Sequence, residues 1–82
     1  MDFSQALQAI KSGHKLTREG WNGKGMWIAL ASGTAFPPGQ YQVMGEYRFP
    51  TVGYIIMKTA AMEMVPWIAS QTDLLANDWE LV

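Results

Sequence analysis

The segment 17–27 concentrates residues that can hold a small polar ligand. It contains two of the four tryptophans, three of the eight glycines and two of the six basic residues of the chain. Trp21 offers a flat apolar face, Asn22 an amide and Lys24 a cation. Asn22-Gly23 is typical of a tight hairpin turn, because both residue types accept positive φ at low cost. The segment therefore predicts a β-hairpin that carries binding groups at its turn.

The residue types available along the chain could serve a nucleotide ligand, and by themselves they are equally typical of many small binding domains. A nucleotide needs a flat face for the base, cations for phosphate and short polar groups for ribose hydroxyls, and stacking contributes about 1–3 kcal/mol per base. Faces come from Trp21, Trp27, Trp67 and Trp79, charges from Arg18, Lys24, Arg48 and Lys58, and hydrogen-bonding groups from Asn22, Ser70, Gln71, Asp73 and Asn77. The sequence favours packing for Trp27 and Trp79, which lie in apolar strands, and leaves packing and ligand contact both open for Trp21.

Catalysis has little support in the sequence. The single histidine, His14, follows a predicted helix, and the seven carboxylates are scattered. Asp73 is expected to cap a helix, with one oxygen left to accept from a ligand, and its spacing from Asp78 is not that of an acid/base pair. The glycine-rich segment 20–25 opens no helix, so it does not match a phosphate-binding loop. We therefore expect a binding protein rather than an enzyme, with no cofactor and no metal site.

The composition limits the partners. A chain of 82 residues is expected to form one domain, residues 1–82. The net charge of −1 gives no general attraction for DNA or RNA polymers. We expect no signal peptide and no membrane-spanning segment. Cysteine is absent from the sequence, which fits a reducing compartment.

The high apolar content predicts self-association. Hydrophobic residues make up 49% of the chain and charged residues 16%, and there are six methionines and four tryptophans. A domain this small cannot hide all of these side chains inside one subunit. Methionine and the large aromatic residues are also enriched in interfaces. We therefore expect a homo-oligomer.

Periodicity predicts an α+β fold, with an antiparallel sheet of four to five strands, an N-terminal helix and a short C-terminal helix. Asp2 and Gln5 form a capping box for a helix over 2–12, with Phe3 at its first turn, and Ser70 with Asp73 caps a second helix over 70–76. Strands are expected at 15–18, 26–31, 54–59, 62–67 and 78–82. The strand 26–31 is expected to be buried on both faces, by the helix and by another subunit. Residues 32–50 are expected to form an ordered loop, with a helical turn or an edge strand within 40–47.

Two blocks of residues carry a resemblance that covers essentially the whole chain. The first is Phe3, Ala6-Leu7 and Ile10-Lys11-Ser12-Gly13 followed by Thr17-Arg18-Glu19-Gly20-Trp21-Asn22-Gly23-Lys24-Gly25-Met26. The second is Pro66-Trp67 followed by Ser70-Gln71-Thr72-Asp73-Leu74-Leu75-Ala76-Asn77-Asp78-Trp79. In this order, the blocks resemble the Thoeris anti-defence type 2 family.

The resemblance implies a small oligomeric sponge encoded by a phage or prophage, expected to be a tetramer in the cytoplasm of the infected bacterial host. Members of the family bind cyclic ADP-ribose isomers made by TIR-domain proteins of the Thoeris system, and they sequester this messenger without cleaving it. Some members also hold cyclic di- or trinucleotides of the CBASS type at separate sites.

The residues and the resemblance together give a site hypothesis. Because a subunit of this size does not easily enclose a two-ribose, two-phosphate ligand, the pocket is expected between subunits. Trp21 or Trp67 would stack on adenine, and Arg18, Lys24 or Lys58 would face the pyrophosphate. Ribose hydroxyls would meet short polar side chains. The candidate ligand-binding residues are Phe3, Arg18, Trp21, Asn22, Lys24, Lys58, Trp67, Ser70, Gln71 and Asp73.

Three other functions compete with this one. A protein-binding module would dock a host or phage partner through exposed aromatic side chains. A phosphodiesterase would degrade the messenger instead of holding it. A single-strand nucleic-acid binder is disfavoured by the net charge.

Overall fold

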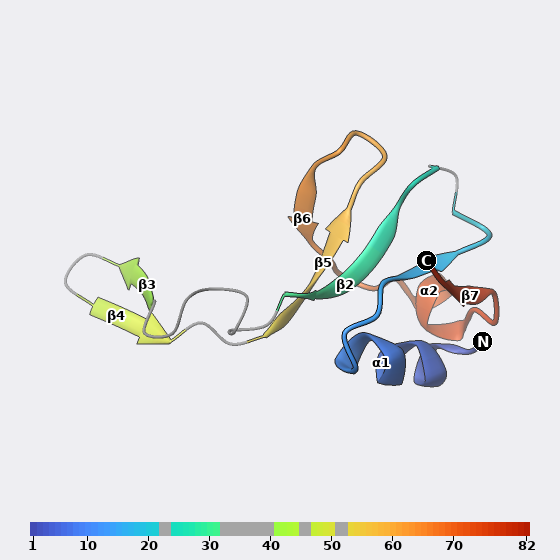
Figure 1. Ribbon diagram of the computed structural model, residues 1–82, viewed down its shortest axis with the longest axis horizontal. Helices are drawn as coiled ribbons and strands as arrows, with labels where there is room; N and C mark the ends of the chain where they lie inside the picture. Colours follow the sequence, from blue (N-terminus) through green and yellow to red (C-terminus); the bar gives the residue numbers. More distant parts are fainter. Residues whose placement is uncertain (22–23, 32–40, 45–46, 51–52) are drawn as a thin grey trace.

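The main sheet has five antiparallel strands in the order β6-β5-β2-β1-β7 (Figure 1). The computed structural model describes residues 1–21, 24–31, 41–44, 47–50 and 53–82. The elements are α1 (Phe3–Lys11), β1 (Leu16–Arg18), β2 (Trp27–Ala31), β3 (Tyr41–Met44), β4 (Tyr47–Pro50), β5 (Tyr54–Lys58), β6 (Met64–Pro66), α2 (Gln71–Leu75) and β7 (Trp79–Leu81). The predicted α+β fold class is confirmed. No helix in the described ranges is both long and apolar enough to cross a membrane.

Local signals set both ends of α1. The Asp2 carboxylate accepts from the Gln5 backbone N–H at 2.9 Å, and the Gln5 side-chain oxygen accepts from the Asp2 N–H at 3.0 Å. At the other end, Gly13 has φ +95° and donates to the Ile10 carbonyl, while His14 donates to the Ala9 carbonyl. This pair of bonds satisfies carbonyls that the last turn leaves without partners. The capping box and the helix are confirmed.

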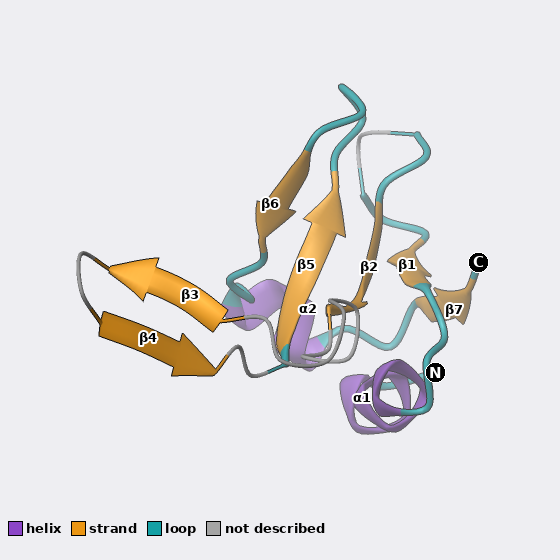
Figure 2. Ribbon diagram, turned by 60° about the vertical axis from the view of Figure 1, so that its left-hand side comes forward, coloured by secondary structure: helices purple, strands orange, loops and turns teal. Residues whose placement is uncertain are grey.

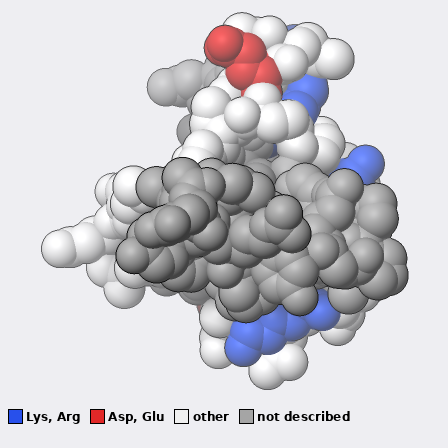
Figure 3. All heavy atoms as spheres, turned by 90° about the vertical axis from the view of Figure 1, so that its left-hand side faces the viewer, with Lys and Arg blue, Asp and Glu red and all other residues white. Residues whose placement is uncertain are grey.

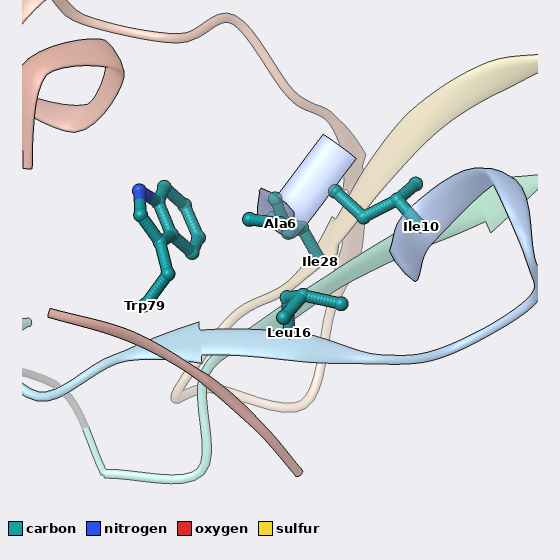
Figure 4. Packing of buried hydrophobic residues seen from close by; sticks show 5 residues of the cluster. All are labelled: Ala6, Ile10, Leu16, Ile28 and Trp79. Atoms are coloured by element: carbon teal, nitrogen blue, oxygen red, sulfur yellow. The ribbon is translucent and has the colours of Figure 1, made fainter. Parts of the chain in front are cut away.

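The core lies where α1 packs on the sheet (Figures 2 and 4). Ala6 and Ile10 of α1, Leu16 of β1, Ile28 of β2 and Trp79 of β7 are buried together. Leu16 pairs with Ile28 on one side and with Leu81 on the other, so β1 lies between β2 and β7. The predicted first hairpin and the predicted closing strand are both confirmed.

The strand β2 is only partly buried within a single chain. Ile28 is fully buried, whereas Leu30 is 37% exposed and the other three residues are half-buried. The helix therefore covers this strand at Ile28. Burial of the remaining surface by another subunit stays a prediction.

The strands β5 and β6 form a second hairpin at the edge of the sheet. Its turn is closed by the Thr59 N–H, which donates to the Glu63 carbonyl at 2.8 Å. Met62 in this turn has φ 64°, a left-handed conformation that is uncommon for a residue with a side chain. Pro66 ends β6, which is an edge strand of the main sheet, a place where proline removes no hydrogen bond of the ladder.

The prediction for residues 32–50 is partly wrong. A two-stranded antiparallel sheet pairs β3 with β4, away from the main sheet in Figure 1. The edge-strand alternative for 40–47 is right for β3, the helical turn is wrong, and β4 was not predicted. The prolines that favoured a loop, Pro37 and Pro38, precede this hairpin, whereas Tyr47 and Phe49 are strong strand formers. Residues 32–40 are outside the described part of the chain.

The core assignment predicts that truncating a buried aliphatic side chain lowers stability far more than truncating an exposed one. Ile28→Ala is expected to lower the free energy of unfolding by about 2–5 kcal/mol, because it removes buried methyl groups and leaves a cavity. Val82→Ala, at a C-terminal side chain that is 67% exposed, is the control and is expected to change it by less than about 0.5 kcal/mol. Urea denaturation at one fixed protein concentration measures both. Equal losses would contradict this core.

Candidate functional site

Three aromatic side chains gather around Trp79 at one end of the molecule, and the four rings together form the aromatic cluster. The Trp79 ring lies 5.5 Å from Phe3, 5.3 Å from Trp21 and 6.1 Å from Trp67, as distances between ring centroids. Trp21 and Trp67 both meet it nearly perpendicularly, at 82° and 87°. Phe3 and Trp67 are 6.0 Å apart. Edge-to-face contacts of this kind fix the orientation of each ring.

Trp79 is part of the core, as its apolar strand predicts. The side chain is 1% exposed, and its indole N–H donates to the Asp73 carbonyl at 3.0 Å. In Figure 4, the ring nitrogen lies on the side away from the other four core residues. The N-terminal ammonium of Met1 donates to the Trp79 carbonyl at 2.7 Å. Trp27 is half-buried, with the Lys15 ammonium 4.7 Å from its ring centroid.

Next to this aromatic cluster, two carboxylates hold the guanidinium of Arg18. Arg18 Nη1 lies 2.8 Å from Asp73 Oδ1, and Arg18 Nε lies 2.8 Å from Asp78 Oδ1. A weaker bond joins Nη2 to Asp78 Oδ2 at 3.4 Å. The side chains of Arg18 and Asp73 are each only 13% exposed. We call these three residues the Arg18 network, which has one positive and two negative charges.

The pKa values of the Arg18 network all shift toward the charged forms. Hydrogen bonds to Asp78 and Asp73 raise the pKa of Arg18. Burial alone would raise the pKa of Asp73, but hydrogen bonds from Trp21, Arg18 and Ser70 outweigh burial and lower it. The bond from Arg18 lowers the pKa of Asp78. All three groups therefore stay ionised at neutral pH.

Asp73 joins the aromatic cluster to the Arg18 network. Its Oδ1 also accepts from the Trp21 indole N–H at 3.1 Å. Its Oδ2 accepts from the Ser70 backbone N–H at 3.2 Å, and its own N–H donates to the Ser70 hydroxyl at 3.1 Å. The predicted capping role is confirmed. The Asp73 oxygen that was expected to accept a hydrogen bond from a ligand already accepts hydrogen bonds from Arg18 and Trp21.

The turn after β1 is held at both ends. The Gly20 N–H donates to Asp78 Oδ2 at 2.9 Å. At the far end, the Lys58 ammonium donates to the Gly25 carbonyl at 2.9 Å. The Thr17 hydroxyl also bridges β1 to the Met26 carbonyl at 2.7 Å. Trp21 and Lys24, two of the groups predicted to bind a ligand, thus lie between these two anchors.

The structure brings most of the candidate residues to one end of the fold. Those that meet in the aromatic cluster and the Arg18 network are Phe3, Arg18, Trp21, Trp67, Ser70 and Asp73. Gln71 is exposed at the start of α2, and Lys24 and Lys58 lie at the far end of the turn. Asn22 and the Arg48 side chain lie outside the described residues. Asp78 was not among the candidates, although it lies in the C-terminal sequence block beside Trp79.

The described residues also show how charged, metal-binding and aromatic side chains are distributed over the surface. In Figure 3, lysine and arginine side chains appear at separate places on the face viewed. Among the described residues, no group of three or more His, Cys, Asp or Glu side chains could hold a metal ion, and no pocket is found. Tyr54 is 43% exposed, whereas the aromatic side chains of the cluster and Trp27 are half-buried or buried. Docking of a partner protein through exposed aromatic side chains stays an untested alternative.

Fold and site together define a small α+β domain in which an aromatic cluster and an ion-pair network adjoin an anchored turn. The model of a Thoeris anti-defense 2-like domain matches residues 1–82. The chain is also 43% identical over 84 residues to a protein of Bacillus phage SP01 named Thoeris anti-defense 2, with all of this chain and 94% of that protein covered. This chain therefore belongs to the Thoeris anti-defense 2-like family, and the resemblance found in the sequence is confirmed.

The Arg18 network predicts a loss of stability in acid. Because the pKa of Asp78 is lower in the folded chain than its ordinary value of 3.8, its contribution is complete above that value and is lost as the pH falls through the folded pKa. Wild-type protein is expected to have a higher urea midpoint than Asp78→Asn at about pH 6, and the difference is expected to be smaller in acid, below pH 3.8. A difference that stays constant between these two conditions would contradict the prediction.

Proposed function

We propose that this protein is a phage anti-defence protein that binds and sequesters cyclic ADP-ribose-type signals made by TIR-domain proteins, without cleaving them. Membership of the Thoeris anti-defense 2-like family supports an anti-defence role. The observation that carries the ligand class is the aromatic cluster with Trp21 fixed by Asp73, beside a turn that contains Lys24 and is bound at its far end by Lys58 of β5. The protein would act in the cytoplasm of the infected bacterial host.

The base would stack on Trp21 or Trp67. Both rings are half-buried, so each is packed on one part and open to a ligand on another. The bond from the Trp21 indole to Asp73 and the contact with Trp79 hold that ring in place before any ligand arrives. A ring that is already ordered loses little conformational entropy on binding.

The pyrophosphate would face Lys24 and Lys58 rather than Arg18. Arg18 directs three of its N–H groups to carboxylates, and the Arg18 network has an excess of one negative charge. Lys58 gives one donor to Gly25, and an ammonium has three. Lys24 is exposed in the same turn. Ribose hydroxyls would meet Asn22, Ser70 and Gln71.

A second subunit would complete the site. Exposed apolar side chains adjoin the cap of α2, with Ile68 90% exposed, Leu75 79% and Leu74 46%. Covering such side chains favours association in water. We propose a homo-oligomer, with a tetramer as the expected form, in which the neighbouring subunit lies opposite Ser70 and Gln71. Cyclic di- or trinucleotides of the CBASS type would bind at separate sites.

Sequestration predicts that the messenger survives binding. Protein incubated with the product of a Thoeris TIR-domain enzyme, desalted and then heated, is expected to release that product unchanged, because the site holds the ligand without a catalytic set. Mass spectrometry of the released material measures this, with ligand heated alone as the control. A cleaved product would indicate a phosphodiesterase, and a desalted protein that carries no ligand would contradict the proposed function.

The charge assignment predicts that Lys24 in the turn and Lys58 at the end of β5 strengthen ligand binding. Lys24→Ala and Lys58→Ala are each expected to weaken affinity for the cyclic ADP-ribose isomer by about tenfold, since each removes a charged hydrogen-bond donor. Lys11→Ala is the matched control, because it removes the same charge from an exposed position at the end of α1. Calorimetric titration measures all three. If Lys11→Ala weakens binding as much, the effect comes from net charge and the assignment is wrong.

A further inference from the structure

Asp78 makes three contacts that its place in the sequence does not predict. Its carboxylate accepts from the Arg18 side chain and from the Gly20 backbone N–H, and its carbonyl accepts from the Glu19 N–H at 3.3 Å. These partners are three consecutive residues, at the point where β1 ends and the turn begins. One residue next to β7 therefore fixes the direction in which the chain leaves β1.

The close approach at Gly20 depends on its missing side chain. A Cβ at this position would lie 2.9 Å from Asp78 Oδ2 and 3.4 Å from Arg18 Nη2. Glycine thus lets the backbone reach the carboxylate. The contact therefore needs both the carboxylate of Asp78 and the absence of a side chain at Gly20.

The effect of Asp78 continues to Trp21. The Trp21 N–H donates to the Arg18 carbonyl at 3.2 Å, and the Trp21 indole donates to Asp73, which also holds Arg18. Both the backbone and the ring of Trp21 are thus linked to Arg18. Asp73 binds Nη1 of the Arg18 guanidinium, and Asp78 binds its Nε and Nη2.

We propose that Asp78 is a positioning residue for ligand binding, which acts through Gly20 and Arg18 to hold Trp21 in its binding orientation. This inference rests on the proposed function and adds a residue to it. Asp78 need not touch the ligand, because its carboxylate is already engaged by protein donors. Its role is to keep the turn in the competent conformation, and apparent affinity falls with the fraction of molecules in that conformation.

The test compares Asp78→Asn with Glu80→Gln. Both changes remove one negative charge from the same end of the chain, but Glu80 is exposed and has no ion pair among the described residues. Asp78→Asn is expected to weaken binding of the TIR-enzyme product by about tenfold, as when a tenth of the molecules stay competent. Glu80→Gln is expected to bind like the wild type. Equal losses in the two variants would overturn the proposal.

A spectroscopic signature separates positioning from a general loss of stability. In nitrogen–proton correlation spectra recorded well below the unfolding temperature, the Gly20 amide and the Trp21 indole N–H are expected to shift and to exchange faster in Asp78→Asn, while the Trp79 indole N–H is unchanged. A Trp21 signal that stays at its wild-type position would overturn the proposal. This readout needs no ligand, so it stands even if wild-type protein binds no cyclic ADP-ribose isomer, the result that defeats the proposed function.

Gly20→Ala tests the same contact without changing charge. The added Cβ crowds the Asp78 carboxylate, so we expect the same shift of the Trp21 signal and a similar loss of affinity. The variant keeps the experiment decisive if Asp78→Asn does not fold. Gly20→Ala with wild-type spectra and affinity would overturn the proposal.

Discussion

The ion pairs of Arg18 with Asp73 and Asp78 join the two ends of the chain, across 55 and 60 residues. Loop closure over such a span costs conformational entropy, which these contacts alone do not offset. The pairing of β1 with β7 and the burial of Trp79 bring the partners together. The register places Arg18 opposite Trp79, so the residue before Trp79 reaches the guanidinium. The Arg18 network therefore depends on the sheet, and the turn depends on the Arg18 network.

The same arrangement explains why the tryptophans have different roles. Trp79 is enclosed because Phe3, Trp21 and Trp67 pack around it from three other segments. Those three remain half-buried, since each has only part of its surface against Trp79. The buried ring thus serves as the support on which the outer rings are oriented. The orientation of the outer aromatic faces is therefore a consequence of packing here, rather than of simple exposure.

Elements with local signals could be predicted from the sequence, and contacts between distant segments could not. The capping boxes of Asp2 with Gln5 and of Ser70 with Asp73 each lie within four residues, and both were predicted. Arg18 was assigned to a ligand because its partner Asp78 becomes apparent only when β1 and β7 are paired. The strand β4 was missed because Pro37 and Pro38 argued for a loop, although they precede the hairpin. The residues of the site are brought together by the register of the sheet, and this register cannot be read from a single sequence.

A protein that acts by sequestration relies on affinity, and nanomolar binding corresponds to about −12 kcal/mol. Every residue that must become ordered on binding reduces the affinity that the contacts provide. Anchoring the turn at Gly20 through Asp78 and at Gly25 through Lys58 places part of that ordering in the folded protein. The two anchoring side chains, Asp78 and Lys58, differ in the hydrogen-bonding groups that they leave unused. The Asp78 carboxylate is occupied by protein donors, whereas the Lys58 ammonium has two further N–H groups that can meet phosphate oxygens.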